Sequence, residues 1–149
     1  MSIDTSKFLK REKPYLTTEQ IKYLITNGFY VGAHSKSHPY YSNLSLKDQL
    51  EETLGSVEVV KNEFQLENLF FSFPFSDAGV SYDFFKKIEK NNILTFGTAG
   101  IKDEIKGVNN IQRIPMEYNT VYSAETIIKG ELILYLIKRV IGMHIIKRL

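Results

Sequence analysis

The segment LFFSFPFSDAG, residues 69–79, indicates the fold class because an apolar run passes directly into a polar loop. Residues 69–73 are mostly apolar and Pro74 ends the run, as expected for a short strand that is covered on both faces. Ser81 follows as the predicted N-cap of the next helix. A strand, a polar loop and a capped helix in this order are typical of α/β proteins.

The same succession extends to both sides of this segment. Further strands are predicted at residues 29–33, 93–96 and 111–114. Further helices are predicted to begin after Thr17 (with Gln20 completing a capping box), Ser45 and Ser123. Strands that alternate with helices imply right-handed crossovers and a mostly parallel sheet. We expect residues 1–15 to form a flexible lead-in and residues 16–149 to form one domain.

Composition is that of an ordinary globular protein. The chain has 149 residues, 43% of them hydrophobic, which is enough for one domain with a sizeable core. The formal net charge of +2 gives no argument for a nucleic-acid partner. The absence of cysteine excludes disulfides, thiolate metal sites and cysteine nucleophiles. Because no signal peptide and no transmembrane segment are visible, we expect a soluble chain, cytoplasmic if it is complete.

Two candidate site loops follow predicted strands, where ligands of parallel α/β proteins gather. The loop after residues 29–33 holds His34 and His38, and neutral imidazoles bind zinc well. A catalytic zinc takes three protein ligands, and Asp77 in the loop after the next strand is the nearest candidate carboxylate. The alternatives are two polar loop histidines and a turn-forming aspartate. The third histidine, His144, is expected to be a surface or packing residue.

Both loops resemble motifs of a known enzyme family, the polysaccharide deacetylases of carbohydrate esterase family 4 (NodB-like). The second motif of that family is H-[S/T]-x-x-H, usually with proline after it, and its matches here are His34, Ser35, His38 and Pro39. The third motif, roughly R-x-P-aromatic, is matched by Pro74 and Phe75. The resemblance extends from about residue 16 to residue 149.

The resemblance implies a distorted (β/α) barrel of the glycoside hydrolase/deacetylase type with mostly parallel strands. It implies a divalent metal, usually zinc, held by His34, His38 and an aspartate. The reaction would be hydrolysis of N- or O-acetyl groups on a polysaccharide, with the metal polarising the acetyl carbonyl and its bound water. The backbone N–H of Phe75 would help to hold the oxyanion. The aromatic side chains that could form walls for a sugar ring, or else belong to the core, are Tyr40, Tyr41, Phe73 and Phe75.

Several parts of the family pattern are missing from the sequence. The first motif, typically T-F-D-D, supplies the catalytic base and the aspartate ligand, and no counterpart precedes the histidines. Ser72 occupies the position of the third motif's arginine, and Arg113 falls in the region of the fourth motif with a poor match. We therefore expect a partial barrel: a fragment, a portion completed by an N-terminal polypeptide, or a family member without catalysis.

Two other functions remain open from the sequence. One is a non-catalytic carbohydrate-binding or assembly module on the same fold. The other is a membrane-surface or partner-binding role for the basic tail at residues 127–149. Because the tail is apolar nearly all round at helical spacing, we expect it to be a buried helix instead. A serine hydrolase is not expected, since G-x-S-x-G is absent.

Overall fold

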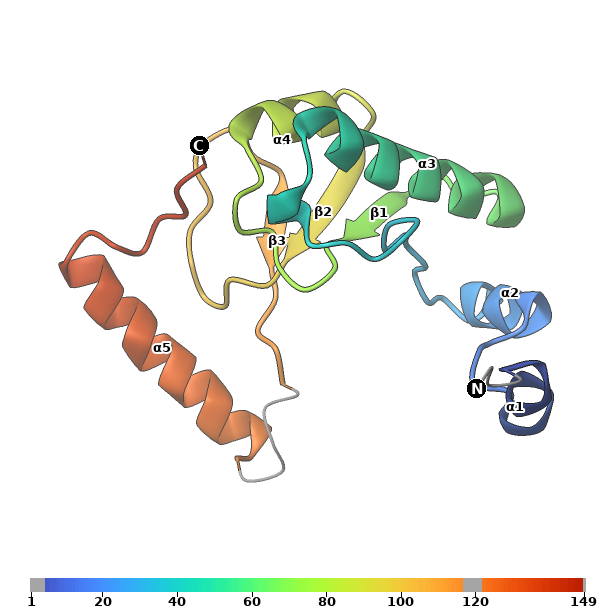
Figure 1. Cartoon of the computed structure of the whole chain (residues 1–149). Helices are drawn as coiled ribbons and strands as arrows, with labels where there is room; N and C mark the ends of the chain where they lie inside the picture. Colours follow the sequence, from blue (N-terminus) through green and yellow to red (C-terminus); the bar gives the residue numbers. More distant parts are fainter. Residues whose placement is uncertain (1–4, 117–121, 149) are drawn as a thin grey trace. The chain divides into compact units, whose positions relative to one another are not determined.

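The computed structural model describes residues 5–116 and 122–148, which fall into two compact units, Met1–Val31 and Gly32–Leu149. The first unit contains the helices α1 (Thr5–Glu12) and α2 (Thr18–Thr26) (Figure 1). The capping box of α2 is confirmed, because Thr17 Oγ1 accepts from Gln20 N–H and Thr17 N–H donates to Gln20 Oε1. Helix α1 lies where the sequence predicts a flexible lead-in; its lysine, leucine, arginine and glutamate residues are good helix formers.

The second unit is built on an open, three-stranded parallel sheet. Its strands are β1 (Leu69–Ser72), β2 (Ile93–Gly97) and β3 (Asn110–Gln112), in the order β1-β2-β3. The predicted α/β class and the parallel pairing are confirmed. Over the described residues β1 and β3 are the two edge strands, so the sheet is open and does not close into a barrel.

The predicted strand at residues 29–33 is wrong except at its last residue. Ala33 forms an isolated parallel bridge with Phe71, in which Ala33 N–H donates to the Phe70 carbonyl and the Ala33 carbonyl accepts from Ser72 N–H. The backbone comes so close to β1 at Gly32 that an added Cβ would lie 2.8 Å from the Phe70 side chain. The bridge places the histidine loop directly beside the carboxyl end of β1.

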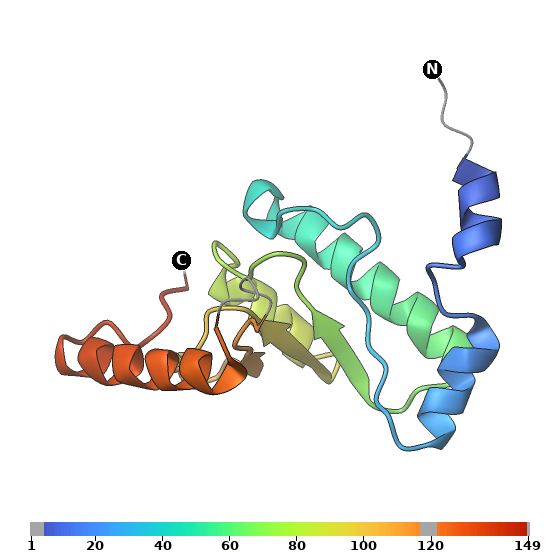
Figure 2. The same ribbon diagram turned by 90° about the horizontal axis from the view of Figure 1, so that it is seen from below.

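Helices α3 (Leu46–Phe64) and α4 (Tyr82–Glu89) contact each other and lie on the same side of the strands (Figures 1 and 2). The predicted caps are confirmed, since Ser45 accepts from Asp48 N–H and Ser81 accepts from Phe84 N–H. The buried apolar core between these helices and the sheet comprises Ala33, Tyr41, Val57, Phe71, Phe73, Val80, Phe84, Phe85, Ile88 and Ile93. Each fully buried large side chain contributes about 1.5–3 kcal/mol, so this layer holds the sheet in place.

The opposite face of the sheet is covered less completely than the sequence predicts. Phe70, Leu94 and Phe96 alternate with the core residues along β1 and β2 and are half-buried. The rings of Phe70 and Phe96 lie 6.1 Å apart. The parallel sheet is therefore helix-covered on one face, whereas strands of this type are usually covered on both.

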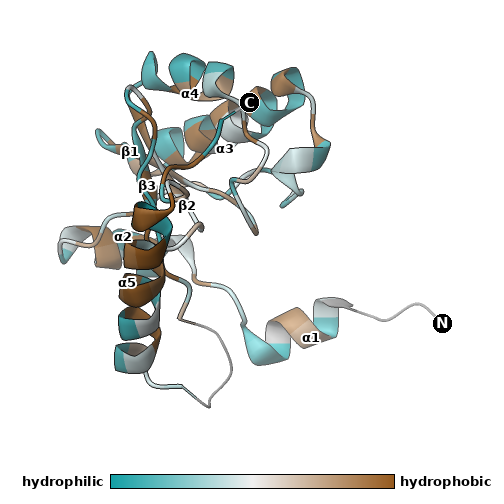
Figure 3. Ribbon diagram, turned by 90° about the vertical axis from the view of Figure 1, so that its left-hand side faces the viewer, coloured by the Kyte–Doolittle hydropathy of each residue, from teal (hydrophilic) through white to brown (hydrophobic). Residues whose placement is uncertain are grey.

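Helix α5 (Ala124–Val140) is capped by Ser123, as predicted, but the expected burial of the tail is wrong. None of its described residues is buried, and Ile133, Ile137 and Val140 are 60, 54 and 87% exposed. Its contacts to the rest of the unit include two polar ones: Glu131 accepts from Ile101 N–H, and the Tyr135 hydroxyl donates to Asp103. Much of the α5 ribbon is coloured as hydrophobic in Figure 3, and because these residues are exposed, the helix presents an apolar surface. Among the described helices, none is both long enough and apolar enough to cross a membrane.

Candidate metal centre

Two histidine side chains meet at the carboxyl end of the sheet. The Nε2 atoms of His34 and His38 are 3.1 Å apart, and the ring planes are inclined by 69°. Two imidazole ligands at about 2.0–2.1 Å from a tetrahedral zinc have their nitrogens about 3.3 Å apart. The structure thus brings the two candidate ligands together at a spacing close to that of two imidazoles on one metal and also within hydrogen-bond distance.

The tautomer of His34 is fixed by a backbone contact. Its Nδ1 lies 2.7 Å from the carbonyl oxygen of Ser72, and a carbonyl only accepts, so Nδ1 carries the proton. In the neutral ring Nε2 then presents a lone pair toward His38. This is the arrangement of metal-binding histidines, which donate their other N–H to a carbonyl or carboxylate. Without a metal, a proton on His38 Nε2 can bridge the pair.

The loop between the histidines is held by Glu52 of α3, which sequence reasoning missed. Its carboxylate accepts from the backbone N–H of Lys36 and of Ser37, at 2.8 and 2.9 Å, and from the Ser37 hydroxyl at 2.8 Å. Slight burial raises the pKa of Glu52, but these hydrogen bonds lower it by more, so the net shift is downward. Within the loop, His38 N–H donates to Ser35 Oγ. Only the position of an acidic residue early in the next helix could have suggested this role.

Three of the six non-glycine residues that have a positive φ in the described part of the chain lie around the same site. Ser35, His38 and Phe75 have φ angles of +68, +56 and +54°. The left-handed region costs about 1–2 kcal/mol for a residue other than glycine. Such residues persist where the surrounding structure holds them, and they cluster at functional sites. The other three, Lys13, Gln65 and Asn92, follow the ends of helices, so the two loops are where a positive φ is not explained by a helix end.

An open pocket of about 650 Å³ adjoins the histidines. It is lined by His34, His38, Phe73, Phe75, Thr98, Arg113, Ile114, Pro115 and Met116. At its rim the ring of Tyr40 stacks on Phe75 with centroids 4.1 Å apart, and both rings are about half exposed. Phe73 lines the pocket but belongs mainly to the core, and Tyr41 is fully buried there. Of the four aromatic residues proposed as sugar-binding walls, Tyr40 and Phe75 have the necessary exposure.

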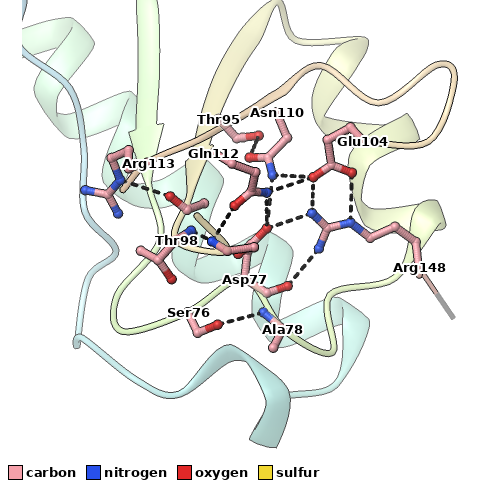
Figure 4. Close-up of polar contacts among 12 residues, drawn as sticks. Ser76, Asp77, Ala78, Thr95, Thr98, Glu104, Asn110, Gln112, Arg113 and Arg148 are labelled. Atoms are coloured by element: carbon pink, nitrogen blue, oxygen red, sulfur yellow. Dashed lines mark hydrogen bonds and ion pairs between the residues drawn. The ribbon is translucent and has the colours of Figure 1, made fainter. Parts of the chain in front are cut away.

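Asp77 lies outside this pocket, in a buried polar network (Figure 4). Its Oδ2 accepts from Arg148, Gln112 and Asn110 at 2.6, 2.8 and 3.0 Å, and its Oδ1 accepts from Thr98 N–H at 3.1 Å. Burial raises the pKa of Asp77, but hydrogen bonds from Arg148 and Gln112 and the Arg148 charge outweigh it, so the pKa is lowered. With its oxygens engaged, Asp77 is not placed as a third metal ligand or as a catalytic carboxylate.

The partners of Asp77 were not predicted from the sequence. Arg148 also binds Glu104 through two hydrogen bonds, and its guanidinium lies 4.5 Å from the centre of the Phe85 ring. The Arg148 side chain is 1% exposed, so the end of the described chain is anchored inside the unit. The buried Arg148 guanidinium, which lies between two carboxylates, has a structural role: it joins the C-terminal residues to the loop that carries Phe75.

No group of three or more candidate ligands is present among the described residues. His144 lies after α5, with its Nε2 3.9 Å from Asp103 and its ring against Tyr135, in agreement with the predicted packing role. Of the three ligands that the sequence predicts, the described structure brings only the two candidates His34 and His38 together. No protein-family model, curated protein or solved structure matches the chain.

Proposed function

We propose that the chain is a metal-dependent carbohydrate deacetylase of the polysaccharide deacetylase type, which hydrolyses N- or O-acetyl groups on a polysaccharide. The observation that carries this proposal is the His34–His38 pair, with its 3.1 Å Nε2 separation and its fixed His34 tautomer. The two histidines would hold a divalent metal, and zinc is the ion that two imidazoles in this geometry suit best. When bound, the metal supplies a Lewis acid for the acetyl carbonyl.

Phe75 is proposed to stabilise the oxyanion through its backbone N–H. Within the described chain this N–H, which follows Pro74, donates to no protein acceptor. The Pro74 carbonyl, which belongs to the same peptide unit as this N–H, accepts from Ser76 N–H at 2.6 Å, so the orientation of the peptide unit is held. A donor that is already oriented loses little freedom when negative charge develops on the substrate oxygen.

The missing ligand and base are proposed to come from a further segment or from an N-terminal polypeptide that completes a (β/α) barrel. Ser72 Oγ, at the position of the family's arginine, is buried with no partner in the described part of the chain. A buried hydroxyl without a partner costs about 1–3 kcal/mol, so a polar group fits beside it. The half-exposed sheet face and the apolar surface of α5 are further surfaces that a completing segment would cover.

Metal content tests the proposal. Protein dialysed against zinc should retain the metal, and His34→Ala or His38→Ala should lower its affinity at least tenfold, because one of two protein ligands is lost. His144→Ala is the matched control and should have no effect. Acetate release from acetylated chito-oligosaccharides, with a metal-stripped control, tests the reaction. Retention of zinc that is equal in all four proteins would refute the assigned ligands.

A non-catalytic carbohydrate-binding module is the second candidate function. It is favoured by the exposed Tyr40–Phe75 stack, since paired aromatic faces bind sugar rings without any metal. This function predicts that Tyr40→Ala weakens glycan binding while no acetate is released by the parent protein. Acetate release above the metal-stripped control would exclude it.

A further inference from the structure

Arg113 spans the carboxyl ends of all three strands. It follows β3 directly, and its Nε–H donates to the Gly97 carbonyl at the end of β2, 3.1 Å away. One Nη2–H donates at 3.4 Å to the carbonyl of Phe73, which follows β1. An arginine with two backbone anchors is held in one orientation, unlike an arginine free in solvent.

Arg113 and the histidine pair are anchored to neighbouring peptide units. The carbonyl of Ser72 accepts from His34, and the next carbonyl, that of Phe73, accepts from Arg113. Both side chains line the same pocket. The end of β1 therefore fixes the position of the guanidinium relative to the candidate metal ligands.

The charge of Arg113 is not neutralised by any described residue. Arg148, on the opposite side of Asp77 in Figure 4, lies between two carboxylates. Arg113 forms no ion pair with a described carboxylate, and none of the pocket-lining residues is acidic. A guanidinium has five N–H donors, so three remain after the two backbone contacts. An open pocket with an anchored, uncompensated cation is complementary to an anion.

We propose that Arg113 binds an anionic substituent, a carboxylate or a phosphate, on the sugar that occupies this pocket. That the ligand is a sugar rests on the proposed function; that it is anionic rests on Arg113. The remaining N–H groups include one on each Nη, which together match the two oxygens of a carboxylate. Because the side chain is already anchored, binding immobilises few additional rotamers. Arg113 is thus a specificity-determining residue for acidic polysaccharides.

Ligand titrations followed by NMR, in the presence of a chelator, test this inference without any metal. The probes are glucuronic acid, glucose 6-phosphate and uncharged glucose. The wild-type chain should bind at least one anionic sugar on the order of 10-fold more tightly than glucose, the usual size of a charge-assisted hydrogen-bonded pair. The stronger of the two anionic probes identifies the substituent.

Arg113→Gln should abolish the preference, and Arg113→Lys should retain part of it, because lysine keeps the charge but not the fork. Arg139→Gln on the exposed face of α5 is the matched control for net charge and should leave the preference unchanged. Equal binding of the three sugars, or a preference that survives in folded Arg113→Gln protein, would overturn the inference. Zinc binding by the histidines is measured separately, so either proposal can fail while the other stands.

Discussion

Replacement of Arg148 by methionine is the most informative test of the buried network. The Arg148 side chain is 1% exposed, and its partners Asp77 and Glu104 are 3 and 10% exposed. Arg148→Met removes the cation but keeps an unbranched chain of similar length, so two buried carboxylates lose their common counter-charge. Removal of one partner from a buried ion pair costs about 3–5 kcal/mol. We expect a loss of this size in the free energy of unfolding at neutral pH, and a Tm lower by about 10–20 °C.

The same variant should have a changed pH dependence. The pKa of Asp77 lies below its ordinary value of 3.8, so its carboxylate contributes stability that is complete above pH 3.8 and is lost as the pH falls through the lower folded-state pKa. In Arg148→Met the burial of Asp77 persists while the cation is gone, so its pKa should rise. The free energy of unfolding of the variant should then fall as the pH rises above 3.8 and Asp77 ionises without its counter-charge. The difference in free energy of unfolding between the variant and the wild type should therefore be smaller in acid than at neutral pH.

Urea unfolding followed by circular dichroism, between pH 3 and pH 8, measures both effects. Arg139→Met makes the same chemical change on the exposed face of α5 and should alter the free energy of unfolding by no more than about 0.5 kcal/mol. If the free energy of unfolding of Arg148→Met stays within that range at neutral pH, or if its loss of stability is the same at every pH, Arg148 is not the counter-charge that stabilises Asp77 and Glu104.

Three further substitutions test individual parts of the structure. Tyr41→Phe should destabilise the chain by about 1–3 kcal/mol in urea unfolding, because it leaves the buried Thr53 hydroxyl without its 2.8 Å partner. No loss would mean that the Thr53 hydroxyl finds another hydrogen-bond partner. Phe75→Gly should be about 1 kcal/mol more stable than Phe75→Ala, because only glycine adopts φ +54° without strain; equal midpoints would argue against the strained backbone. Gly97→Ala should lower the free energy of unfolding by about 1–3 kcal/mol, because the added Cβ would overlap the Asp77 carboxylate. An unchanged free energy of unfolding would mean that the hydrogen bonds around Asp77 rearrange to accept the methyl group.

Local signals in the sequence were sufficient for most of the helices. Each of the predicted N-caps at Thr17, Ser45, Ser81 and Ser123 accepts the expected backbone N–H. An N-cap depends on contacts within three residues, so the sequence contains the whole interaction. The predicted strand at residues 69–73 differs from β1 by one residue, because Pro74 marks its end.

Features that depend on distant partners were not predictable in the same way. The predicted strand at residues 29–33 failed because pairing needs a neighbour, and only Ala33 has one. Asp77 was considered as a metal ligand, but its main partner, Arg148, lies 71 residues further along the chain. The burial expected of the tail was also wrong, since apolar periodicity cannot specify which surface covers a helix. The proximity of His34 and His38 was predictable because a separation of four residues keeps both rings in one short loop, and the bridge at Ala33 sets that loop beside the end of β1.

The central claim is that His34 and His38 bind one metal through their Nε2 atoms. Long-range ¹H–¹⁵N NMR spectra of the histidine rings, recorded during a zinc titration, test it most directly. Metal-free His34 should carry its proton on Nδ1, and zinc should shift the Nε2 resonances of His34 and His38 together while those of His144 stay unchanged. A proton on Nε2 of metal-free His34, or rings of His34 and His38 that do not respond to zinc, would contradict it.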